Sequence, residues 1–155
     1  MRAFARFLMI AALVVWLGGI VFFSFVVAPT AFSVLPARES AGLMVGRSLG
    51  ALHRIGLVSG VVFFAATFLT QLKRAKALRG LVFVMLLCTV ASQFGVTPQM
   101  QRIRENVGGS ILALPPQDAG RAAFDRLHQL SLVLEGIVLV SGIGVLALIA
   151  REETA

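Results

Sequence analysis

The chain has 155 residues, of which 58% are hydrophobic and 14% charged, and its mean hydropathy is +0.92. This balance excludes an ordinary soluble domain, in which about a quarter of the residues are charged. The formal net charge of +7 does not indicate nucleic acid as a partner, because the Lys and Arg residues cluster at the ends of apolar segments. We therefore expect an integral membrane protein whose first partner is the lipid bilayer.

Four apolar segments are each long enough to cross a hydrocarbon core, which takes about 20 helical residues. We place the membrane spans at about 7–28, 52–72, 80–98 and 127–150. Because no length remains for a soluble domain, residues 1–155 are expected to form a single transmembrane domain. The predicted fold is an all-α integral membrane four-helix bundle with four transmembrane spans and short interfacial helices on the outer side.

Prolines mark the expected ends of two spans. The first span resembles a secretory signal, but its length and the position of Pro29 favour an uncleaved helix that stops at Ala28. Residues 37–54 have helical spacing, and they either lie along the membrane interface or extend the second span. The third span is expected to end at Thr97-Pro98, where proline can open a further short helix.

Basic residues predict the orientation. The turn at 73–79, between the second and third spans, carries four basic residues and no acidic one. With the N-terminus inside, the inner basic residues lie in short flanks close to the span ends. The outer ones are spread over two long connections that also carry acidic residues. This density predicts a multi-pass protein of the cell inner (plasma) membrane with both termini in the cytoplasm.

Polar residues in the spans define a candidate binding site. In the last span His128, Ser131 and Glu135 share one helix face. Polar groups at the same depth are expected from the other spans: Ser24, Ser59 and Gln93. A carboxylate in hydrocarbon costs on the order of 2.5 to 3.5 kcal/mol, so Glu135 should face the interior, with Gln93 as its first candidate partner.

We predict that these residues line an outward-facing polar vestibule that binds or transports a small solute or cation. The predicted substrate-binding residues are His128, Ser131, Glu135, Arg104, Arg102, Gln93 and Asp125. The competing interpretation is that they only join helices by hydrogen bonds, each of which contributes about 0.6 kcal/mol.

Two other functions stay open. His53 opens the second span and His128 the fourth, near the same membrane face, which suits the ligation of a b-type haem in a redox membrane protein. The third hypothesis is a non-catalytic structural subunit of a homo-oligomer or a larger membrane complex. Small-residue helix faces, such as the one that carries Gly56 and Gly60, would then form the contacts.

Enzymatic chemistry has little support in the sequence. It contains no G-x-S-x-G, HExxH, P-loop or G-x-G-x-x-G pattern. The single Cys88 lies within an apolar run that holds no second thiol and no histidine. We therefore expect neither a catalytic residue nor a metal site, and a non-enzymatic role is favoured over an enzymatic one.

Several segments together resemble one family. They are WLGGIVFFSFVVAPTAF at 16–32, Ala41-Gly42, TPQMQRIR at 97–104, and Phe124 with Leu127, His128 and Ser131. Over nearly the whole chain, the sequence resembles the bacterial domain of unknown function 4149, related to the eukaryotic transmembrane protein 205.

This resemblance implies a four-span membrane protein whose shared polar positions correspond to Pro98, Arg104, His128 and Ser131. The family has no established biochemical activity. Its eukaryotic relative is associated with platinum-drug resistance and vesicle traffic, which suggests transport. His53 and Glu135 depart from the aromatic and neutral polar residues that the resemblance leads us to expect there.

Overall fold

The computed structural model describes residues 1–108 and 110–152, and its long elements are all helices. In chain order the elements are α1 (Arg2–Phe22), the π-helical segment η1 (Phe23–Val27), α2 (Ala28–Val34), α3 (Arg38–Ala66), α4 (Ala75–Val90), the π-helical segment η2 (Ala91–Val96), α5 (Thr97–Asn106), the 3-10 helix η3 (Ile111–Ala113) and α6 (Ala119–Ala150). Within the described residues, four continuous helical runs are long and apolar enough to cross a membrane: 2–34, 38–66, 75–106 and 119–150. The predicted all-α membrane bundle is therefore confirmed.

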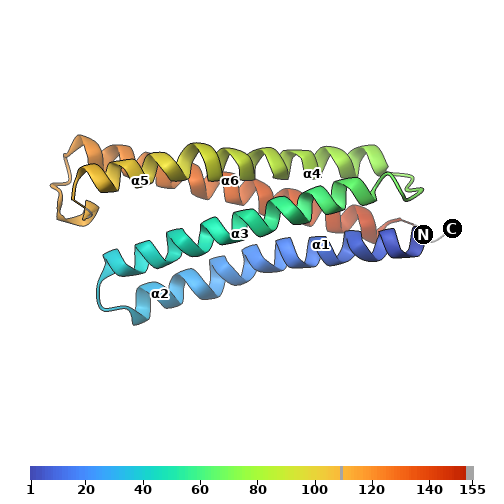
Figure 1. The fold of residues 1–155 in the computed structure, drawn as a ribbon, viewed down its shortest axis with the longest axis horizontal. Coiled ribbons are helices and arrows are strands. Elements are labelled where there is room, and N and C mark those ends of the chain that lie inside the picture. The colour runs from blue at the N-terminus through green and yellow to red at the C-terminus, as the bar shows by residue number, and fades with distance from the viewer. Residues whose placement is uncertain (109, 153–155) are drawn as a thin grey trace.

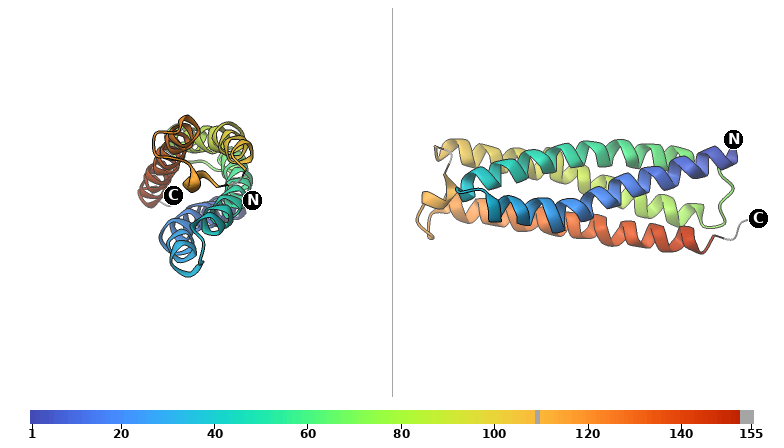
Figure 2. Two further views of the ribbon diagram at one scale, coloured as in Figure 1. Left: turned by 90° about the vertical axis from the view of Figure 1, so that its left-hand side faces the viewer. Right: turned by 90° about the horizontal axis from the view of Figure 1, so that it is seen from below.

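The four runs lie alongside one another, and the two ends of the bundle differ (Figure 1). Both chain ends and the α3–α4 connection lie at what we call the terminal end, and the α2–α3 and α5–α6 connections lie at the distal end. α1 packs on α3, α4 packs on α6, and further contacts of α3 with α4 and of α1 with α6 close the ring. Toward the distal end, the α2–α3 pair and the α5–α6 pair separate, as the end-on and lengthwise views also show (Figures 1 and 2).

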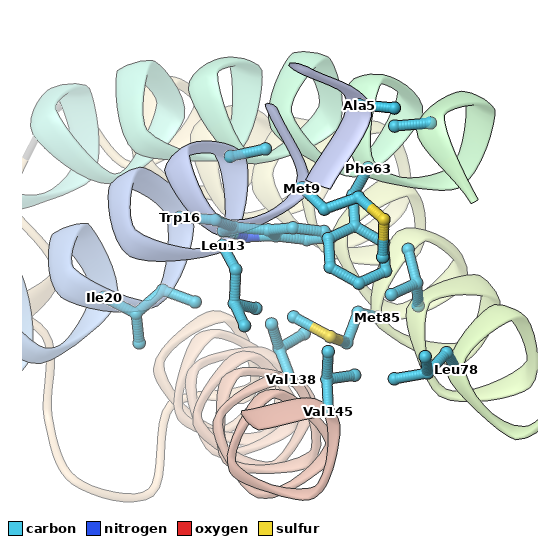
Figure 3. Packing of buried hydrophobic residues seen from close by; sticks show 13 residues of the cluster. Ala5, Met9, Leu13, Trp16, Ile20, Phe63, Leu78, Met85, Val138 and Val145 are labelled. Carbon is cyan, nitrogen blue, oxygen red and sulfur yellow. The ribbon is translucent and has the colours of Figure 1, made fainter. Parts of the chain in front are cut away.

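The apolar core occupies the terminal half of the bundle, around Trp16 (Figure 3). Its buried residues are Ala5, Met9, Ala12, Leu13, Trp16, Ile20, Phe63, Ala66, Leu78, Val82, Met85, Val138 and Val145. Glycines make room for it, because a Cβ at Gly60 would lie 2.6 Å from the Trp16 ring and one at Gly142 would lie 2.6 Å from Leu17. Large apolar side chains such as Phe7, Phe25 and Phe94 point outward, as lipid-facing residues do.

The two prolines do not end their helices, so the predicted stops at Ala28 and Thr97 are wrong. Directly before Pro29, the N–H of Ala28 donates to the carbonyl of Phe23, five residues back. Directly before Pro98, the N–H of Thr97 donates to the carbonyl of Ser92, also five residues back. This wider turn accommodates a residue that lacks an N–H and whose ring clashes with the preceding turn. As a consequence α2 continues the first span, and α5, expected as a separate short helix, continues the third.

The segment before the second span also extends that span, which is one of its two predicted alternatives. α3 is a single helix from Arg38 to Ala66, where Thr67 ends it by donating its hydroxyl to the carbonyl of Phe64 at 2.6 Å. His53 therefore lies well inside a helix and not at its opening. This placement decides the geometry of the candidate site.

Candidate polar site between three spans

His53 lies in the interior, where α3, η2 and α6 meet, and only 3% of it is exposed. Its Nδ1 is 3.0 Å from Oε1 of Gln93 in η2, and its Nε2 is hydrogen-bonded to Oε1 of Glu135 in α6. Three side chains from three spans thus form one connected group, which we call the His53 cluster (His53, Gln93 and Glu135). Among the described residues, its His53–Glu135 contact is the one ion-pair contact between side chains.

The sequence places His53 inside because it belongs to a stripe of small residues on one face of α3. The members of this stripe recur at helical spacing: Gly42, Gly46, His53, Gly56 and Gly60. A Cβ at Gly50 would lie 3.8 Å from Oε1 of Gln93, so η2 also comes close to the α3 backbone just above His53. Because this face of α3 is rich in glycine, side chains from both neighbouring spans can reach the imidazole.

The hydrogen bond between Nε2 of His53 and Oε1 of Glu135 requires one proton between these two atoms. Because Oε1 of Gln93 accepts, Nδ1 of His53 is the donor of that hydrogen bond. The proton between Nε2 and Glu135 then makes either an imidazolium with a carboxylate or a neutral imidazole with a carboxylic acid. Both forms have zero net charge, which avoids most of the cost of an isolated charge in hydrocarbon.

Two buried hydroxyls flank the cluster. Ser131 is buried one helical turn before Glu135, on the same face of α6. Ser92 precedes Gln93 in η2 and is fully buried, and its Oγ has no hydrogen-bond partner among the described residues. A buried hydroxyl without a partner costs about 1–3 kcal/mol, which a ligand or an ordered water would offset.

A second contact joins the helix pairs near the distal end. The Arg104 guanidinium of α5 lies 5.5 Å from the centre of the Phe124 ring of α6. The same guanidinium would lie 3.5 Å from a Cβ at Gly42 of α3, so it reaches across to the other pair. Seen end-on, η3 lies over this end of the bundle, with Ile111 buried (Figure 2, left).

The predicted site residues differ in exposure: Ser131 is buried, and Gln93, Glu135 and Arg104 are half-buried. Arg102, Asp125 and His128 are exposed and have no hydrogen bond or ion pair with another described residue. Ser24, expected at the same depth, is exposed on η1. Gln93 was the expected partner of Glu135, but in the structure His53 stands between them. The glycine stripe of α3, followed through residue 53, would have indicated this.

A haem held by His53 and His128 would require both side chains to move. Both ring nitrogens of His53 already have partners, and His128 faces outward. The residues present therefore do not fit a haem with two histidine ligands in this conformation. The haem hypothesis stays a prediction, and a Soret band in the visible spectrum of protein expressed with ample haem tests it.

These observations define a class: an integral membrane protein with four spans and a buried histidine–carboxylate pair between three of them. The chain matches the model of the family described as Domain of unknown function (DUF4149) over residues 11–108, and it belongs to that family. No curated protein and no solved structure matches the chain. His53, Gln93 and Arg104 lie within the matched residues, whereas Glu135, Ser131 and His128 lie beyond them, so the match is shorter than the resemblance led us to expect.

Proposed function

We propose that the His53 cluster binds a small monovalent cation in exchange for a proton. The observation that supports this is the part-buried hydrogen bond between Nε2 of His53 and Oε1 of Glu135, which needs one proton between side chains of two spans. A group that serves only to join helices has no need of a carboxylate, since neutral amides and hydroxyls join spans at a lower desolvation cost.

The exchange conserves charge and proton number. The cation takes the place of the proton between His53 and Glu135, and that proton leaves to water. The Glu135 carboxylate then neutralises the cation, and Oε1 of Gln93 and the Ser131 hydroxyl are the nearest candidates for further oxygen ligands. A monovalent cation keeps the site neutral before and after exchange, whereas a divalent one would leave a buried positive charge.

The distal end provides the access route in this proposal. There the backbones of the two helix pairs separate (Figure 1), but the Arg104 side chain reaches from α5 toward Gly42 and η3 lies over the end (Figure 2, left), so both would have to let the ion pass. The apolar core around Trp16 lies on the other side of the cluster. Transport across the membrane would require this core to open, so binding and transport are separate claims with separate tests.

The orientation belongs to the same proposal. The dense basic flanks, with Lys73, Arg74, Lys76 and Arg79 between α3 and α4, lie at the terminal end and support cytoplasmic termini in the cell inner membrane. The His53 cluster would then open toward the outside. Labelling of single cysteines introduced at Lys76 and Asp125 in intact cells, after Cys88→Ser, tests this placement. Reagent that does not cross the membrane should modify only position 125.

Proton release on cation binding tests the binding claim. Sodium or potassium chloride is added to the purified protein in detergent at low buffer strength, with choline chloride as the ionic-strength control. We expect the metal chloride to release up to about one proton per chain more than choline chloride does. Glu135→Gln should abolish this difference, because the neutral amide holds no exchangeable proton.

The matched control is Glu105→Gln, which removes an exposed carboxylate of α5 at the distal end. It should release as many protons as the unmodified protein. Equal release with choline chloride, or release that survives Glu135→Gln, would show that the cluster only joins helices. Cation flux into proteoliposomes, compared between the same variants, then decides whether the bound ion also crosses.

A further inference from the structure

The face of α3 that points away from the bundle carries two arginines. Arg47 and Arg54 lie two helical turns apart on one side of the helix, on a different side from the glycine stripe that carries His53, and both are exposed. Nε of Arg54 donates to the carbonyl of Gly50 at 3.2 Å. This bond lays the side chain along α3 toward the distal end, so the Arg54 guanidinium is directed toward Arg47.

Arg54 lies at membrane depth. Its neighbour His53 contacts Gln93 and Glu135, and both of these lie inside apolar runs of their spans. No carboxylate forms a salt bridge with Arg47 or Arg54 among the described residues. An exposed arginine beside hydrocarbon is costly unless it reaches an anion, and the anions available along a membrane helix are lipid phosphates.

An apolar groove lies between α3 and the first helical run. Its lining residues are Phe22, Val26, Val27, Thr30, Ala31, Val34, Leu35 and Met44. Thr30 is the single polar residue among them. The groove begins at the wide π turn η1, the segment that carries the first helix through Pro29.

The groove continues into a polar hollow. This hollow is lined by Ser40, Leu43, Met44, Arg47 and Ser48, so Met44 belongs to both. One end of the joint surface therefore offers a guanidinium and two hydroxyls, and the other offers only apolar side chains and one threonine. A molecule that fills both has an anionic head and a hydrocarbon chain.

We propose that this surface binds a phospholipid with an anionic headgroup. The phosphate lies between Arg47 and Arg54, with the hydroxyl of Ser40 or Ser48 as a further donor, and one acyl chain occupies the groove past Met44. The site faces away from the His53 cluster and does not depend on the function proposed for that cluster.

The test measures lipid affinity from the shift of the thermal unfolding midpoint. The purified full chain in detergent is titrated with dioleoyl-phosphatidylglycerol, and separately with dioleoyl-phosphatidylcholine and with inorganic phosphate. Arg47→Gln and Arg54→Gln should each weaken the apparent phosphatidylglycerol affinity about fivefold, and the double variant about 30-fold. Arg38→Gln is the matched control, because Arg38 is exposed on the same helix but on another face.

A second variant tests the groove without changing charge. Met44→Trp adds bulk where the two hollows join, and it should weaken phosphatidylglycerol binding while circular dichroism and proton release stay unchanged. The proposal is overturned by an equal response to phosphatidylcholine, or by affinity that persists in the double arginine variant. If inorganic phosphate reproduces the shift, the ligand of this surface is a free anion and not a lipid. If the unfolding midpoint depends on protein concentration and on none of the added ligands, this face is a contact between two copies of the chain and not a lipid site.

Discussion

The two halves of the bundle are held together in different ways. In the terminal half, all four spans contribute to one apolar cluster around Trp16, and glycines of α3 bring that helix close to the indole. The turn that ends this half is also tied, because the Glu152 carboxylate accepts the backbone N–H groups of Lys73 and Arg74 at 3.1 and 2.7 Å. Close packing therefore accounts for the cohesion of this half.

In the distal half the two helix pairs separate, and polar side chains reach from one pair to the other. His53 connects to Gln93 and Glu135, and Arg104 reaches from α5 toward Gly42 of α3. A region held by a few polar contacts can change its occupant or its opening without repacking a core. The contrast predicts that substitutions in the terminal half mainly affect stability, and substitutions in the distal half mainly affect ligand exchange.

The largest expected effect comes from Trp16→Ala. It empties the centre of the terminal half, and truncating a buried tryptophan in this way costs about 3–5 kcal/mol of unfolding free energy. Equilibrium unfolding in mixed detergent and sodium dodecyl sulfate micelles measures it. The matched control, Phe25→Ala, removes an outward-facing aromatic ring of η1 and should change the unfolding free energy by less than about 0.5 kcal/mol. Equal losses would mean that the core around Trp16 has no special part in holding the bundle.

The second effect is the coupling between His53 and Glu135. A double-mutant cycle with His53→Gln, Glu135→Gln and both changes isolates the energy of the pair. We expect a coupling of about 1–2 kcal/mol, the upper part of the range for polar contacts between membrane helices, because the two side chains are hydrogen-bonded directly and His53 is buried. The same unfolding measurement applies. A coupling near zero would assign the cohesion of the distal half to other contacts.

The third effect is selective for the site. Pro98→Ala restores the missing backbone N–H at position 98, so the π turn η2 that precedes it is no longer required. The helix can then tighten and rotate Gln93 away from His53. Cation-dependent proton release should fall severalfold while the unfolding free energy changes by less than about 1 kcal/mol. Pro29→Ala makes the same change at η1, which holds none of the cluster, and should leave proton release unchanged.

The halves also differ in how far the sequence predicted them. Apolar runs of about 20 residues indicated four spans, and the structure confirms them, because hydrocarbon thickness alone sets that length. The glycines of the terminal half also predicted close helix contacts, and in the structure they make room for Trp16 of the same chain. Contacts between copies of the chain or with other membrane proteins stay a prediction.

The distal half was harder to predict because two local rules were overridden. Pro29 and Pro98 normally indicate helix ends, but a single π turn in front of each carries the helix onward. Charged residues normally mark the edge of a span, and Arg54 therefore suggested that His53 lies at the interface. In the structure Arg54 faces outward along α3 while His53 faces inward, so one helix position separates an exposed guanidinium from a buried imidazole. Counting charges along the sequence does not show which face of the helix each residue of one turn occupies.

The smallest expected effect is the one that most directly probes the separation of the helix pairs. Arg104→Ala removes the guanidinium over Phe124, a contact that contributes about 0.5–1 kcal/mol at a partly exposed site. Arg102→Ala, on an exposed face of the same helix, should cost less than about 0.5 kcal/mol, and mixed-micelle unfolding resolves the two. Because Arg104 also reaches toward Gly42, its removal should speed proton release at the His53 cluster in stopped-flow measurements, whereas Arg102→Ala should not. A loss of stability in Arg104→Ala as large as that of Trp16→Ala would show that one arginine, and not the apolar core, joins the two pairs.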